Sequence, residues 1–227
     1  MILFLSAIKQ EREAVRRAWR LERGGTIEGG LELHHGEGCV HLCTGMGADR
    51  VVQGLETGVR VFRPRLVALV GYSVGLQSDM SVGRVLADSR SHQDFHQSFV
   101  GVRIGPVATC GFLLTASQKA AFAERHPEAP AADLESEAFL EAVPPEVRAV
   151  VVRSVSDDRD TDLPLDFSKL SDERGFPSPR AIALALSKRP HALGSILRLA
   201  KDSRVATRTL GDFLSQTKDE WMELARN

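Results

Sequence analysis

Short apolar runs alternate along the chain with longer segments in which apolar residues recur every three or four positions. Short runs are typical of buried strands, and the longer period is typical of amphipathic helices. On this basis we predict strands at 2–7, 31–35, 39–44, 66–71, 83–88, 100–104 and 149–155. We predict helices at 10–20, 48–62, 117–125, 134–142, 179–188, 191–201 and 204–225.

This alternation predicts an α/β protein in which helices cover both faces of a central sheet. The run 149–155 is almost continuously β-branched, as expected for a strand buried on both faces. We therefore expect a three-layer αβα arrangement around a mixed, largely parallel sheet. The composition changes only after residue 160, where proline-containing turns precede three helical segments. We expect one domain over 1–227, with a C-terminal helical elaboration over about 160–227.

Composition narrows the classes of protein that fit this pattern. The 29 Lys and Arg residues balance 30 Asp and Glu residues, so no overall field favours nucleic acid as a partner. Cys39, Cys43 and Cys110 are too few for a disulfide framework, which favours a cytoplasmic location. The apolar start of the chain lacks a charged segment before it and runs directly into the polar segment 9–12, so we expect a first strand there and no leader. No later run approaches the roughly 20 apolar residues of a membrane span.

One short motif suggests a serine hydrolase. The segment Gly71-Tyr-Ser-Val-Gly75 matches the G-x-S-x-G nucleophile elbow, with Ser73 as the nucleophile, and Asp157 and His191 follow in hydrolase order. An elbow must lead directly into a helix, and residues 76–85 have no helical period. We therefore rank a serine hydrolase low.

The spacing of the histidines is only a weak indication of a metal site. His92 and His96 are four residues apart, and His34, His35 and His41 fall on neighbouring predicted strands. No third ligand with supportive spacing lies near 92–96, so we expect no bound metal.

Polar segments follow the ends of several predicted strands. These segments are Glu11, 44–47, 71–76 and 156–157, and the segment 133–136 opens a predicted helix with carboxylates. Ligands bind at the carboxyl edge of the strands in open α/β sheets. We expect these segments to meet in one site.

The same segments resemble the nucleoside phosphorylase/nucleosidase superfamily, and in particular 5'-methylthioadenosine/S-adenosylhomocysteine nucleosidases, over residues 1 to about 158. The spacing from Gly47 through Pro64 to Leu76, and from Phe112 through Glu135 to Asp157, is similar to theirs without gaps. The resemblance implies the nucleoside phosphorylase fold, cleavage of the N-glycosidic bond of an adenosyl nucleoside with release of adenine, no cofactor and a homodimer.

The part of the chain after Asp157 is similar to a second branch of that superfamily. Residues 162–167 and the basic helices that follow look like a branch associated with hopanoid synthesis, which removes adenine from adenosylhopane. That likeness implies a lipid nucleoside as substrate, with inorganic phosphate as co-substrate if the enzyme is a phosphorylase.

The resemblance implies roles for three carboxylates. Asp157 matches the general acid that protonates N7 of the purine, although an aspartate in the Asp-rich loop 156–160 can also be a simple cap. Glu135 matches the residue that binds the ribose hydroxyls, although it can also merely favour a helix N-terminus. Glu11 matches the residue that activates water, and its alternative is an ordinary glutamate of a surface helix.

The remaining expected substrate-binding residues are neutral, with one exception. The resemblance places Leu134, Phe112, Leu113, Met46, Tyr72, Ser73 and Gly75 around the substrate. The exception is Arg153, which ends an otherwise apolar strand and must pair with an acid of the site or bind an anion.

Two departures from the family pattern keep alternatives open. Tyr72 and Val74 stand where the nucleosidases have small residues, and Arg84 replaces an aspartate. We therefore weigh a nucleoside hydrolase first, a phosphorylase of an adenosyl lipid second, and a non-catalytic nucleoside-binding relative third. The helices over 178–201 carry Lys188, Arg189, Arg198 and Lys201, which would support weak contact with anionic membranes.

Overall fold

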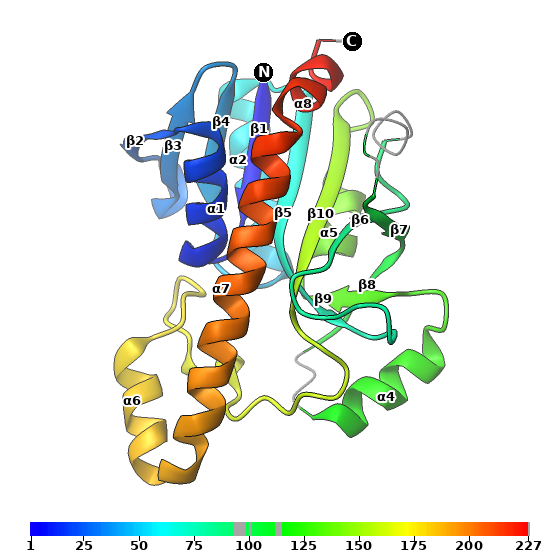
Figure 1. Cartoon of the computed structure of the whole chain (residues 1–227). Helices are drawn as coiled ribbons and strands as arrows, with labels where there is room; N and C mark the ends of the chain where they lie inside the picture. The colour runs from blue at the N-terminus through cyan, green and yellow to red at the C-terminus, as the bar shows by residue number, and fades with distance from the viewer. Residues whose placement is uncertain (93–98, 100, 112–114, 227) are drawn as a thin grey trace.

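The computed structural model describes residues 1–92, 99, 101–111 and 115–226, and a mixed sheet lies at its centre (Figure 1). The strands are β1 (Ile2–Ser6), β2 (Glu22–Thr26), β3 (Glu32–Gly36), β4 (Cys39–Cys43), β5 (Leu66–Gly75), β6 (Val85–Asp88), β7 (Arg103–Gly105), β8 (Val107–Thr109), β9 (Ala131–Asp133) and β10 (Arg148–Asp157). They pair in the order β2-β3-β4-β1-β5-β10-β6-β7, and β9 joins β8 to β5. The central strands β4, β1, β5 and β10 are all parallel.

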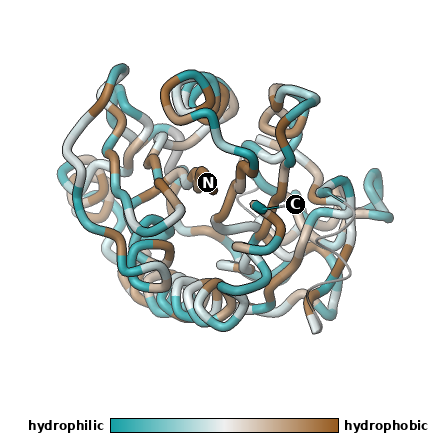
Figure 2. Tube along the Cα trace, turned by 90° about the horizontal axis from the view of Figure 1, so that it is seen from above, coloured by the Kyte–Doolittle hydropathy of each residue, from teal (hydrophilic) through white to brown (hydrophobic). Residues whose placement is uncertain are grey.

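Helices cover both faces of this sheet (Figure 2). They are α1 (Lys9–Trp19), α2 (Ala48–Phe62), α4 (Ala116–Arg125), α5 (Ser136–Ala142), α6 (Pro179–Lys188), α7 (Leu193–Gln216) and α8 (Lys218–Leu224), with short 3-10 turns at Glu28–Gly30, Phe167–Leu170 and Pro190–Ala192. Strand residues alternate between two cores, as the pleat requires. Ile2 and Phe4 pack with α1, α7 and α8, whereas Leu3 and Leu5 pack with α2 and α5. The expected three-layer αβα fold is thus confirmed.

The C-terminal helices are part of the main core and not only an addition to it. Leu210 and Leu214 of α7 are fully buried against the sheet, and the ring of Trp221 in α8 lies 5.5 Å from that of Phe4. The other end of α7 extends past the sheet and forms a hairpin with α6 (Figure 1). This end carries exposed Leu193 and Leu197.

Most predicted elements are confirmed, with the following corrections. Strand β5 continues to Gly75 instead of ending at 71, and α7 is continuous where we predicted a break at 202–203. The short strands β2, β8 and β9 were not predicted. In the part of the chain that the structure describes, no helix is long and apolar enough to cross a membrane.

Candidate active site

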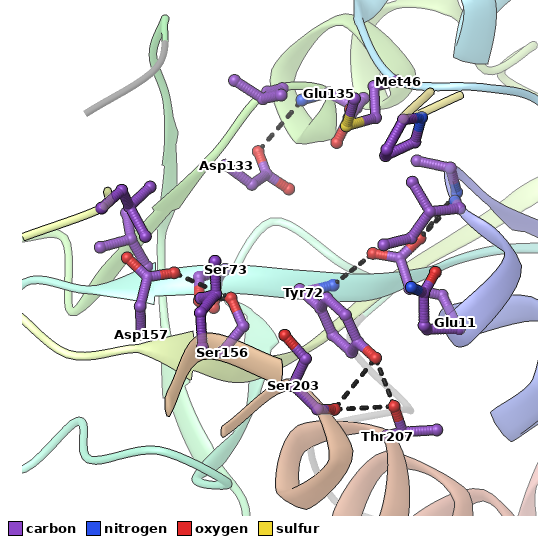
Figure 3. A pocket seen from close by; sticks show the side chains of 18 of the residues that line it. Glu11, Met46, Tyr72, Ser73, Asp133, Glu135, Ser156, Asp157, Ser203 and Thr207 are labelled. Carbon is purple, nitrogen blue, oxygen red and sulfur yellow. Dashed lines mark hydrogen bonds between the residues drawn. The ribbon is translucent and has the colours of Figure 1, made fainter. Parts of the chain in front are cut away.

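A cavity of about 470 Å³ opens at the carboxyl ends of β1, β5 and β10 (Figure 3). Its polar lining includes the carboxylates of Glu11, Asp133, Glu135 and Asp157. Figure 3 shows Glu11 and Asp157 on opposite sides, with Asp133 and Glu135 between them along one wall. The volume is within the range of small-molecule sites, which is about 300–1,000 Å³.

Glu11 is held by backbone groups from two elements. One carboxylate oxygen accepts from the N–H groups of Ala7 and Ile8 at 2.8 and 2.9 Å, and the other accepts from the N–H of Tyr72 at 2.8 Å. Burial raises the pKa of Glu11, and Arg153 and these N–H groups act in the opposite direction. The carboxylate is therefore fixed at the start of α1, facing the end of β5.

Arg153 is the buried cation behind this wall. Its guanidinium forms ion pairs with Asp133 and, at 3.5 Å, with Glu135, and its side chain is 0% exposed. A Cβ atom on Gly71 would lie 2.4 Å from Nη1 of Arg153 and 2.6 Å from Oε1 of Glu11. Only glycine at position 71 therefore allows Arg153 and Glu11 to come together beneath β5.

Glu135 is a buried carboxylate whose pKa is raised to near neutral. It precedes α5, accepts from the N–H of Gly47 at 2.9 Å and is 4% exposed. Burial raises the pKa of Glu135 to about 7; Arg153 lowers it, and Asp133 raises it further. Near neutral pH this side chain can therefore donate or accept a hydrogen bond.

Asp157 ends β10 and is bonded through both carboxylate oxygens. Oδ1 accepts from the hydroxyl of Ser156 at 2.9 Å, and Oδ2 accepts from the ammonium of Lys119 at 2.7 Å. Burial raises the pKa of Asp157, and Lys119 and Ser156 act in the opposite direction. The carboxyl group still lines the cavity.

The segment 71–75 is strand, which removes the geometry of a nucleophile elbow. Ser73 lies within β5, where an elbow would need a sharp turn into a helix. Its hydroxyl is buried and has no hydrogen-bond partner among the described residues. Tyr72 turns away to α7, where its hydroxyl donates to the carbonyl of Ser203 at 3.2 Å and contacts Thr207.

One side of the cavity is apolar and comes from the C-terminal helices. Ile182 of α6 and Ile196, Leu199 and Ala200 of α7 line it, together with Leu163 and Pro177. Arg204 lines the same cavity and is exposed. The hairpin of α6 and α7 thus supplies an apolar wall opposite the carboxylates.

The structure brings together most of the site residues expected from the sequence. Those that line the cavity are Glu11, Met46, Tyr72, Ser73, Leu134, Glu135 and Asp157. Gly75 does not line it, because β5 turns this residue against the carbonyl of Met80. Arg153 does not line it either and holds Asp133 and Glu135 from behind. Phe112 and Leu113 lie outside the described residues.

Two residues of the site were missed from the sequence. Asp133 lies in a segment that we singled out, but we did not assign it as the partner of Arg153. Lys119 falls in the predicted helix 117–125, where we gave it no role, and it shares the buried face of α4 with Phe122 three residues later. A lysine on the apolar face of a helix was the available indication. Among the described residues, no three His, Cys, Asp or Glu side chains are arranged to hold a metal ion.

Comparison with known proteins gives matches at the level of structure. No family model matches the chain, and no curated protein matches it by sequence. A 5'-methylthioadenosine/S-adenosylhomocysteine nucleosidase from Helicobacter pylori superimposes with a TM-score of 0.70 at 14% identity, covering 96% of this chain and 97% of that one. Futalosine hydrolase from the same organism gives 0.69 at 14% identity, covering 96% and 97%. The nucleosidase from Neisseria meningitidis, in complex with methylthio-immucillin-A, gives 0.68 at 15% identity, covering 96% and 98%.

These likenesses extend over nearly the whole of each chain, although sequence identity is low. The chain has the fold of the nucleoside phosphorylase/nucleosidase superfamily.

Proposed function

We propose that this protein hydrolyses the N-glycosidic bond of a purine nucleoside and releases adenine. The observation that carries the proposal is the placing of Glu11 and Asp157 on opposite sides of one cavity, with Glu135 between them (Figure 3). The structural neighbours are a nucleosidase and a futalosine hydrolase, which supports nucleoside cleavage as the class of reaction.

Asp157 is the general acid in this proposal. Its proton passes to N7 of the purine while the C1'–N9 bond breaks, and the electron pair of that bond stays with the base. Adenine then leaves as a neutral molecule, and Asp157 becomes a carboxylate. A buried carboxyl group with a raised pKa suits this role, because it keeps its proton closer to neutral pH than an exposed aspartate does.

Glu11 and Glu135 act on the sugar. Glu11 takes a proton from water, and the resulting hydroxide adds to C1' of the cationic sugar to give free ribose. The three backbone N–H groups that donate to the Glu11 carboxylate fix its orientation. Glu135 binds the ribose hydroxyls, and these contacts strengthen as positive charge develops on the sugar.

The charge of the cavity favours water over phosphate as the nucleophile. Four carboxylates line it, and Arg204 is the only Lys or Arg among its described lining residues. A phosphate dianion would be repelled by those of these groups that are ionised, including Glu11 when it acts as a base, whereas neutral water would not. The proposed hydrolysis needs no cofactor.

A second candidate is cleavage of an adenosyl lipid, with phosphate as co-substrate. The apolar wall from α6 and α7 supports it, because a long apolar 5' substituent could extend along Ile182, Ile196 and Leu199. The exposed Leu184, Leu193 and Leu197 on the same hairpin would allow weak contact with a membrane surface. A homodimer and a cytoplasmic location stay predictions of the sequence.

Adenine release by the purified protein tests the proposal. Adenosine, 5'-methylthioadenosine and a 5'-alkyl adenosine are incubated with and without inorganic phosphate, and free adenine is measured by chromatography. Hydrolysis predicts equal release in both buffers, and loss of release in Glu11→Gln. Asp160→Asn is the matched control, since the side chain of Asp160 is 85% exposed in the loop after β10. Release only with phosphate would favour the lipid phosphorylase, and binding without release would favour a non-catalytic relative.

A further inference from the structure

Lys119 is a buried cation to which the proposed reaction gives no role. It lies on α4, its side chain is 0% exposed, and it reaches Asp157 from the side away from the cavity lining. Burying an ammonium group is costly unless the charge is paired and each N–H finds an acceptor. The groups that accept hydrogen bonds from Lys119 therefore indicate its role.

All three protons of this ammonium have acceptors. Nζ donates to Oδ2 of Asp157 at 2.7 Å, to the carbonyl of Asp158 at 2.8 Å and to the carbonyl of Thr161 at 2.7 Å. Asp157 is the only carboxylate among these acceptors. The two carbonyls belong to the loop that leaves β10, so they fix the ammonium beside Asp157.

The helix that carries Lys119 is fixed to the same loop at its first turn. Asp162 accepts from the N–H of Ala116 at 2.7 Å, and Thr115 caps α4 by accepting from the N–H of Gln118 at 3.2 Å. The position of Lys119 along α4 is therefore set independently of the ion pair. The fold therefore holds Lys119 beside Asp157 even without their ion pair.

We infer that Lys119 is a positioning residue that holds the general acid Asp157 and stabilises the carboxylate left when its proton has passed to the purine. This inference rests on the proposed function. The proton on N7 comes from Asp157, and the negative charge that appears on Asp157 lies 2.7 Å from the positive charge of Lys119. Lys119 therefore makes Asp157 a stronger acid for a weakly basic ring nitrogen.

The charged groups around Asp157 determine the expected pH dependence. Lys119 from α4 lowers the pKa of Asp157, Ser156 lowers it through its hydrogen bond, and Asp158 in the following loop raises it. Cys110 lines the same cavity. Burial raises the pKa of its thiol to about 12, and the negative charges of Asp133, Glu135 and Asp157 act in the same direction. When the charge of Lys119 is removed, burial and Asp158 still raise the pKa of Asp157, and only Ser156 lowers it. Asp157 therefore keeps its proton to higher pH.

The test compares Lys119→Gln with the unchanged protein. Glutamine keeps two N–H donors for the loop carbonyls but has no charge. Activity as kcat/KM falls with rising pH as the free enzyme loses the proton of its acid. We expect this alkaline limb to move to higher pH in Lys119→Gln, so that the ratio of kcat/KM at about pH 8 to that at about pH 6 rises, while the maximal kcat falls by about tenfold or more.

Two further variants separate positioning from simple structural support. Lys119→Arg keeps the charge, and we expect its alkaline limb to stay near that of the unchanged protein. Lys169→Gln is the matched control, since Lys169 pairs with Asp166 at 3.1 Å but is 82% exposed; its pH profile should not change. An alkaline limb in Lys119→Gln that coincides with that of the unchanged protein would overturn the inference.

A measurement without substrate tests the inference even if the variant turns over substrate poorly. The side-chain carboxyl of Asp157 is followed by carbon NMR against pH, with its signal assigned from Asp157→Asn. We expect its titration to move to higher pH in Lys119→Gln, and an unmoved titration would contradict the inference. If the unchanged protein releases no adenine, or if Asp157→Asn is fully active, the proposed function itself fails. An unmoved limb with an inactive Asp157→Asn removes only the role of Lys119.

Discussion

Replacing Glu135 by glutamine should stabilise the protein near neutral pH while it weakens nucleoside cleavage. Glu135 is 4% exposed, and burial together with Asp133 raises its pKa from 4.5 to about 7 despite Arg153. Glutamine resembles the protonated glutamate in shape and can still accept from the N–H of Gly47. The substitution therefore removes a buried ionisation without removing the side chain.

The size of the effect follows from proton linkage. Between about pH 4.5 and about 7 the folded protein keeps a proton on Glu135 that the unfolded chain has lost. Folded protein thus binds more protons, and the free energy of unfolding falls as pH rises through this window. The change in pKa from 4.5 to about 7 corresponds to about 3 kcal/mol. Glu135→Gln lacks this fall, so it should match the unchanged protein near pH 4 and exceed its stability by up to about 3 kcal/mol at pH 8.

Urea denaturation across this pH range measures the effect. The difference in the free energy of unfolding between Glu135→Gln and the unchanged protein is followed from about pH 4 to about pH 8. Glu137→Gln is the control, since Glu137 lies two residues after Glu135, in the first turn of α5, and its side chain is 53% exposed. The difference for this variant should stay flat across the pH range. Other carboxylates titrate in both proteins and cancel in the comparison. A difference for Glu135→Gln that does not grow with pH would refute the reasoning.

Three further predictions concern the acid Asp157, the glycine Gly71 within β5 and the helical hairpin. Asp157→Asn should fold and bind nucleoside but lower kcat by about 10²-fold or more, and substantial turnover by this variant would remove Asp157 as the acid. Gly71→Ala should lose about 1–3 kcal/mol of stability and most activity, because its Cβ would press on Arg153 and Glu11, and a urea midpoint equal to that of the unchanged protein would contradict this packing. If the substrate is a lipid nucleoside, the protein should float with anionic vesicles at low salt and detach at high salt, and no binding at low salt would count against the membrane contact.

Long apolar segments made the fold predictable from the sequence. The central strands and the helices α2 and α6 lie where the pattern placed them, because burial on one or both faces leaves a clear period. The strands β8 and β9 have three residues each, too few for any period to show. The predicted break at 202–203 was wrong, because α7 runs without interruption from Leu193 to Gln216. The hydroxyls of Thr207 and Tyr72 both donate to the carbonyl of Ser203 within this helix.

The site was predictable where the chemistry lay in contiguous motifs, and hidden where it depended on tertiary pairing. Glu11, Glu135 and Asp157 each follow or precede a recognisable element, so their meeting could be expected. The position of Arg153 in an apolar strand showed that it needs an acidic partner. The sequence did not show that this partner is Asp133. Lys119 and Asp157 are 38 residues apart, and no local pattern joins them.

Incorporation of labelled oxygen tests the central claim most directly. The unchanged protein is incubated with an adenosyl nucleoside in phosphate-free buffer containing H₂¹⁸O, and the sugar product is analysed by mass spectrometry beside free adenine. Glu11 beside the sugar predicts one ¹⁸O atom at C1' for each adenine released, and loss of this product in Glu11→Gln. Adenine release that requires phosphate and leaves ¹⁸O out of the sugar, or no release at all, would contradict the account.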